Sequence, residues 1–141
     1  MNPAQVKLVQ STFEIVAPNA ETVANLFYQR LFELDPNLRP MFKSDMKAQG
    51  AKLMKTLAFV VWGLHETNKL IPVVSQLGER HVGYGVTDEH YDTVGAALLW
   101  TLQTGLGEKF TPEVEDAWAT AYNLLADVMK HAIAAAEMEP M

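Results

Sequence analysis

The chain has 141 residues, 49% of them apolar, a net charge of −6 and no cysteine. A chain of this length and composition can form one domain with a hydrophobic core. The negative charge argues against nucleic acid or an anionic membrane as the main partner, because both attract basic surfaces. The lack of cysteine excludes disulfides, thiolate metal sites, iron–sulfur clusters and covalent haem attachment through C-x-x-C-H.

Export and membrane signals are missing from the sequence. The N-terminal segment MNPAQVKLVQ lacks a basic region followed by an apolar run. The longest apolar run, Leu57 to Leu64, is far too short to span a membrane. We therefore expect a cytoplasmic protein with one domain over residues 1–141.

Apolar residues recur at helical spacing in the first half of the chain and predict three main helices. The first begins at Asn2-Pro3, a cap followed by proline, and ends before Pro18. The second covers about 20–34, a short helix follows it, and the third covers roughly 46–65.

The second half of the chain continues the helical pattern. After a link at residues 67–68, Pro72 is expected to start a modest helix that ends near residue 81. Thr87 should cap the next helix, glycines near Gly105 should end it, and Pro112 should open the last one. Because no strand pattern or repeat is evident, the sequence predicts an all-α domain of about seven to eight helices.

One of the four histidines stands apart. His81 is surrounded by glycines at 78, 83 and 85, which allow the backbone and a large planar group to approach closely. His65, His90 and His131 sit near helix ends and are expected to be structural or solvated. From spacing alone, an ordinary core or surface histidine is favoured over a ligand at position 81.

The other candidate residues carry no function when taken singly. Tyr28 and Phe42 are typical core aromatics, and Gln49 is an ordinary helix residue on a rim. The segment GYG at 83–85 lacks the third glycine and the preceding strand of a dinucleotide-binding fingerprint. Periodicity therefore predicts the fold rather than the function.

Four segments taken together resemble a globin, in particular the bacterial single-domain haemoglobins and the haem domain of flavohaemoglobins. They resemble, in order, the second and third helices with their corner, the distal helix, the proximal histidine segment and the last helix: NLFYQRLFELDPNLRPMF, QGAKLMKTL, LGERHVGYGVTDEHYDTVGAALL and AWATAYNLLADVM. The resemblance extends over nearly the whole chain and implies a globin fold that encloses a haem pocket.

The resemblance also implies roles for single residues. His81 matches the proximal iron ligand of a non-covalent haem b, and Phe42 matches the corner phenylalanine that packs on the haem. Tyr28, Gln49 and Leu53 match the distal residues that face a bound gas. Further haem contacts are expected from Leu57, Leu77, Tyr91, Val94 and Leu98.

The implied function is an oxygen-binding haemoglobin for storage, transport or scavenging, with NO and CO as other ligands. A phenol and an amide near O₂ each add about 1–3 kcal/mol of hydrogen bonding, so we expect slow O₂ release. Three alternatives remain: a nitric oxide dioxygenase with a separate reductase, a gas or redox sensor acting through a partner, and a haem-free interaction module. Whether the chain is an enzyme is open at this point.

Two departures from flavohaemoglobins bear on these alternatives. Those proteins continue into flavin and nicotinamide domains, so we expect this chain to need an external reductase for turnover. Their last helix carries a glutamate that pairs with the proximal histidine. Counted without gaps from Tyr122, that place holds Ile133, with Glu137 one turn further on. The charge that favours dioxygenase chemistry is therefore not matched.

Overall fold

The structure is a computed structural model that describes residues 1–42, 45–82 and 88–138. Within these ranges, the side chains of residues 41, 77–82, 88 and 131–138 lie outside the description. The described backbone forms α-helices and short 3₁₀ segments and contains no strand, which confirms the all-α prediction.

Six α-helices account for most of the described chain. They are α1 (Pro3–Val16), α2 (Ala20–Leu34), α3 (Met46–Gly63), α4 (Thr67–Val82), α5 (Asp88–Leu106) and α6 (Pro112–Met138). Four 3₁₀ segments join them: η1 (Ala17–Asn19), η2 (Pro36–Met41), η3 (Leu64–Glu66) and η4 (Gly107–Lys109).

The helix count is slightly lower than the seven to eight predicted, because a segment expected to be a short helix is 3₁₀. Pro40 lies inside this segment and has no backbone N–H, so it cannot make the bond to residue 36 that an α-helix would require there. Instead the Phe42 N–H donates to the Arg39 carbonyl, three residues back, at 3.1 Å.

The start of the first helix follows the prediction. The side chain of Asn2 accepts the Gln5 N–H at 2.8 Å, and the side chain of Gln5 accepts the Asn2 N–H at 3.1 Å. This reciprocal pair satisfies two N–H groups that a helix end would otherwise leave exposed. The end of α5 at Leu106 also falls between the glycines expected to end it.

The predicted start of α4 is wrong. The helix begins at Thr67 and contains Pro72, whereas the sequence suggested a link at 67–68 and a start at Pro72. Leu70 and Val74 are only 5% and 2% exposed. We attribute the extra turn to the burial of Leu70 against the rest of the core, which outweighs the backbone donor lost at Pro72.

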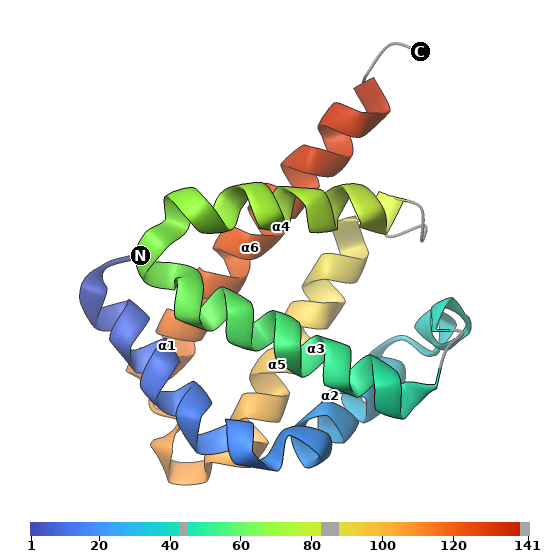
Figure 1. The fold of residues 1–141 in the computed structure, drawn as a ribbon. Coiled ribbons are helices and arrows are strands. Elements are labelled where there is room, and N and C mark those ends of the chain that lie inside the picture. The colour runs from blue at the N-terminus through green and yellow to red at the C-terminus, as the bar shows by residue number, and fades with distance from the viewer. Residues whose placement is uncertain (43–44, 83–87, 139–141) are drawn as a thin grey trace.

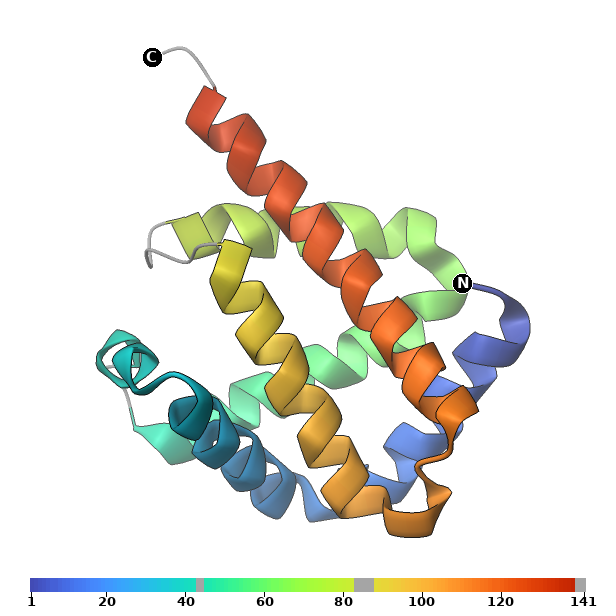
Figure 2. The same ribbon diagram turned by 180° about the vertical axis from the view of Figure 1, so that it is seen from behind.

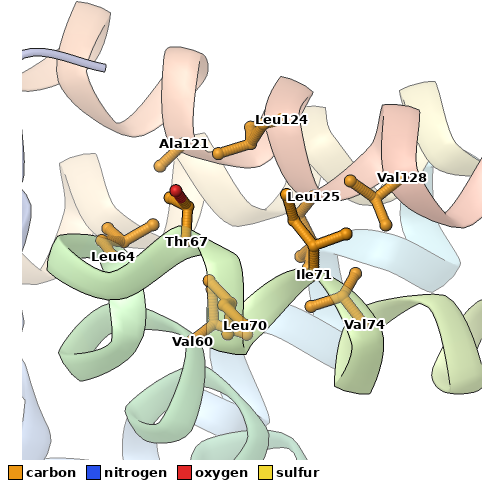
Figure 3. A pocket seen from close by; sticks show the side chains of 10 residues that line it. All are labelled: Val60, Leu64, Thr67, Leu70, Ile71, Val74, Ala121, Leu124, Leu125 and Val128. Atoms are coloured by element: carbon orange, nitrogen blue, oxygen red, sulfur yellow. The ribbon is translucent and has the colours of Figure 1, made fainter.

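The interface of α4 with α6 is closely packed. Figure 3 shows apolar side chains from both helices, such as Ile71, Leu125 and Val128, pointing toward one another. The gap left between them is about 10 Å³ and apolar, which is too little for a useful ligand site. This interface fixes the direction of α4 relative to the core.

Figures 1 and 2 show the arrangement of the helices. Helices α5 and α6 run antiparallel in one layer, and α3 and α4 cross the other side of the molecule. The last turn of α4 lies next to the first turn of α5 in both views. In the part of the chain that the structure describes, no helix combines the length and the apolar character needed to cross a membrane.

Candidate functional site

A cavity of about 320 Å³ lies among α2, α3, α5 and α6. Its volume is within the range of pockets that hold small organic ligands. Eight of the residues predicted from the sequence line it: Tyr28, Phe42, Gln49, Leu53, Leu57, Tyr91, Val94 and Leu98. The tertiary structure therefore brings together residues from four separate segments of the chain.

Two predicted residues cannot be placed as side chains. His81 and Leu77 belong to α4, with His81 in its last turn, but both side chains lie outside the described part of the structure. The glycine-rich segment 83–87, including the expected cap at Thr87, also lies outside it, as do the side chains of Ile133 and Glu137.

The ring of Tyr28 is held in the cavity wall by neighbouring aromatic rings. Its centroid lies 5.1 Å from that of Phe27, 5.4 Å from that of Phe42 and 6.1 Å from that of Phe32. The contacts with Phe27 and Phe42 are edge-to-face, which is a favourable geometry for aromatic pairs. The position of this ring therefore does not depend on a hydrogen bond from its hydroxyl.

Among the described residues, the Tyr28 hydroxyl makes one long contact. It lies 3.5 Å from the Gln49 carbonyl oxygen, at the outer limit of hydrogen-bond geometry. Burial raises the pKa of Tyr28 to about 12, because the ionised phenolate would lose its hydration. The hydroxyl thus keeps its proton at neutral pH and can donate a hydrogen bond to a ligand in the cavity.

A close crossing of α2 and α3 sets the distance between Tyr28 and Gln49. A Cβ atom on Gly50 would lie 2.9 Å from the Cβ of Ala24, closer than real side chains approach. Glycine at position 50 therefore lets the two helices touch. Tyr28 follows Ala24 by one turn, so the crossing places it against the Gln49 end of α3.

Tyr122 also lines the cavity, and the sequence did not identify it as a site residue. Its hydroxyl donates to the Tyr91 carbonyl oxygen at 2.6 Å, which joins α6 to α5. Burial raises the pKa of Tyr122, and the nearby Tyr91 and Asp92 raise it further. Helical periodicity indicated that this residue faces inward, but no local signal could reveal an acceptor 31 residues earlier.

Other polar groups border the cavity. His90 is half-buried in its wall, which corrects the expectation of a solvated side chain; at this end of α5, His90 and Tyr91 line the cavity, whereas Glu89 is exposed. Lys52 and Thr56 are exposed and line the cavity at the same time, so they mark its edge. His65 is exposed, as predicted.

The described side chains do not form a metal site by themselves. No group of three or more histidine, aspartate or glutamate residues comes together among them. The cavity does fit a flat apolar group, because Leu53, Leu57, Val94 and Leu98 line it and Phe42 adds an aromatic surface. The exposed Lys52 at the edge suits acidic substituents on such a group.

Comparison with protein families identifies the class of protein. The globin family model matches residues 25–129, so this chain belongs to the globin family. Membership of this family implies haem binding, in agreement with the mostly apolar lining of the cavity.

Known relatives narrow the comparison. The chain is 31% identical to the flavohemoprotein of Bacillus subtilis over 125 residues, covering 86% of this chain and 31% of that protein. It is 34% identical over 127 residues to the flavohemoprotein of Rhodopirellula baltica, with 87% and 31% covered. The chain thus spans about a third of the length of these relatives.

A solved structure supports the fold. A bacterial globin from Campylobacter jejuni superposes with a TM-score of 0.84, covering 98% of this chain and all of that chain, at 23% identity. The predicted globin fold is therefore confirmed, and so is the resemblance to bacterial single-domain globins and flavohaemoglobins.

Proposed function

We propose that this chain is a single globin domain that binds haem b and holds O₂ tightly for storage, transport or scavenging. The observation that carries the proposal is the Tyr28 hydroxyl. It lines the cavity, it keeps its proton because burial raises the pKa to about 12, and its nearest acceptor among the described residues is 3.5 Å away. A buried donor with its hydrogen bond barely used is what a bound polar gas requires.

The proposal assigns a role to each predicted residue. His81 would bind the iron through a ring nitrogen, and the haem would be surrounded by Phe42, Leu53, Leu57, Leu77, Tyr91, Val94 and Leu98. When bound, the haem iron supplies a position that takes O₂, NO or CO. Tyr28 would donate a hydrogen bond to the ligand, and Gln49 would add a second one from α3.

The same cavity wall excludes water from the ligand. Leu53 and Leu57 are partly buried against the core, and Phe42 packs against both Tyr28 and Phe32. An apolar surrounding strengthens hydrogen bonds to a polar ligand because water does not compete for them. O₂ should therefore gain more from this site than the less polar CO.

The test is the visible spectrum of the purified protein in its ferric, ferrous and oxygenated forms, followed by the O₂ release rate. A Soret band that shifts to a stable oxygenated form, with slow release, is the expected result. A colourless protein that takes up no added haem would overturn the proposal and favour a haem-free interaction module. An oxygenated form that loses O₂ as fast in the wild type as in Tyr28→Phe would remove the role of Tyr28.

A nitric oxide dioxygenase is the second candidate, because the chain is similar to flavohemoproteins over most of its length. It would need an external reductase for turnover. Ile133, at the place of the family's glutamate, speaks against it. NO consumption in the presence of O₂ and a reductase distinguishes the two functions. Turnover limited only by the supply of electrons would favour the dioxygenase, whereas a single stoichiometric reaction would favour the oxygen binder.

A further inference from the structure

The outward side of α3 differs from the rest of the molecule in charge. The three charged residues of α3 are all lysines, Lys47, Lys52 and Lys55, although the whole chain has a net charge of −6. All three are exposed. This helix therefore forms a basic strip on an acidic protein.

Two large apolar residues extend the strip. Phe59 and Trp62 are 51% and 43% exposed, whereas side chains of this kind are mostly buried in folded proteins. Phe59 follows Lys55 by four residues and Trp62 follows Phe59 by three, so all three lie on the same side of the helix. An exposed aromatic pair next to positive charge is typical of a protein-binding surface.

We name this strip the α3 outer face and define it by Lys52, Lys55, Thr56, Phe59 and Trp62. From Lys52 to Trp62 it extends roughly 15 Å along the helix. Its first members, Lys52 and Thr56, also line the edge of the cavity. A partner bound to the α3 outer face would therefore contact the rim of the haem pocket.

We propose that the α3 outer face docks a small acidic electron-carrier protein that reduces the haem. The proposal rests on the proposed function, because an oxidised globin binds O₂ only after its iron has been reduced. In this step one electron leaves the reduced carrier and converts ferric iron to ferrous iron, and no bond is made or broken. The lysines attract the acidic carrier, and Phe59 and Trp62 provide the apolar contact.

The charge pattern separates this partner from the two main alternatives. A second copy bound face to face by two-fold symmetry would offer the lysines no acidic partner, because α3 contains no aspartate or glutamate. Anionic membranes attract clusters of about four to eight basic residues, and the α3 outer face has only two lysines. A short strip also suits the small, transient interfaces of electron-transfer complexes.

The first test measures binding directly. Haem-loaded protein is titrated calorimetrically with an oxidised flavodoxin of strongly negative charge, at low and at high salt. We expect a weak complex that weakens about tenfold between roughly 20 and 300 mM salt. The variants Lys55→Glu and Trp62→Ser should each weaken it by about fivefold or more at low salt.

Matched control variants place the same kinds of substitution outside the α3 outer face. Lys109→Glu reverses an exposed lysine in η4, and Ile15→Ser removes an exposed apolar side chain of α1. Both should bind the flavodoxin within about twofold of the wild type. If Trp62→Ser fails to fold, Lys55→Glu decides the outcome, because an exposed lysine contributes little to stability.

The second readout is the rate of haem reduction. Reduced flavodoxin should reduce Lys55→Glu about fivefold or more slowly than the wild type, whereas dithionite, which needs no docking, should reduce both equally. Equal rates and equal affinities with flavodoxin would overturn the proposal while leaving the oxygen-binding function intact. The proposal would also be overturned if the wild type bound anionic vesicles, or formed a dimer, and if Lys55→Glu and Trp62→Ser abolished that association. A chain that takes up no haem would instead refute the proposed function itself.

Discussion

Two tyrosines that line the cavity from different helices use their hydroxyls in different ways. On α6, the Tyr122 hydroxyl donates a short bond of 2.6 Å to the Tyr91 carbonyl. On α2, the Tyr28 hydroxyl lies 3.5 Å from the Gln49 carbonyl and is held in place by aromatic rings instead. Burial raises the pKa of both side chains, so the two differ in their bonding rather than in their protonation.

The difference teaches how to separate a structural tyrosine from a ligand-binding one. Tyr28 and Tyr122 are the same residue type, both are largely shielded from solvent, and both line the same cavity. Only the geometry of the nearest acceptor distinguishes them. A hydroxyl already committed to a 2.6 Å bond gains little by turning to a ligand, whereas one at 3.5 Å loses little.

The largest expected effect comes from Tyr28→Phe. Removing this donor should speed O₂ release by roughly 10- to 100-fold, because one hydrogen bond to a polar ligand contributes about 1–3 kcal/mol. Stopped-flow measurement of O₂ displacement checks the rate. CO release should change far less, and an equal change for both gases would indicate a general distortion of the pocket.

A substitution at Gly95 should disturb the packing of Tyr122, the tyrosine on α6. A Cβ atom at position 95 would lie 2.7 Å from Cε2 of Tyr122, so Gly95→Ala forces the ring to move. We expect the free energy of unfolding to fall by about 1–3 kcal/mol, as is typical of overpacked cores. Urea titration gives this value.

The matched control for Gly95→Ala lies in the same helix. In Gly105→Ala the new Cβ would meet only the end of a valine side chain, Cγ1 of Val16, at 3.3 Å. Because alanine favours helix over glycine, this variant should be as stable as the wild type or more so. A loss of stability as large in Gly105→Ala as in Gly95→Ala would contradict the packing explanation.

Alkaline pH should act on both tyrosines. For Tyr28 the folded pKa of about 12 lies above the unfolded value of about 10, so the neutral form is favoured on folding. Its contribution to stability is complete below pH 10 and is lost as the pH rises through 12. Between pH 9 and 11, the wild type should lose about 1 kcal/mol more than Tyr28→Phe, measured by urea titration at each pH.

The smallest expected effect comes from Tyr122→Phe. In a helix, the Tyr91 carbonyl also accepts the N–H four residues on, so the carbonyl keeps an acceptor role after the hydroxyl is removed. We expect a loss of about 1 kcal/mol in the free energy of unfolding and an O₂ release rate within about threefold of the wild type. An O₂ release rate that rises as much as in Tyr28→Phe would show that the two hydroxyls are not distinct.

Much of the fold could be predicted from local patterns. The spacing of apolar residues and the Asn2 cap placed the first helix correctly, and the boundaries of α2 were predicted from about residue 20 to residue 34. The prediction failed at Thr67, where tertiary burial of Leu70 extends α4 past a proline. Local rules describe what a segment prefers by itself, and they do not include contacts with distant helices.

The candidate site divides in the same way. The sequence by itself determined the chemical groups, which are Tyr28, Gln49 and a run of apolar residues on helical faces. The resemblance to globins predicted that these residues line one pocket. Only the tertiary structure decided that Tyr122 is bound to the Tyr91 carbonyl and that His90 faces the cavity. The reason is physical: hydrogen-bond geometry and burial depend on helix crossings, and residues far apart in the chain set those crossings.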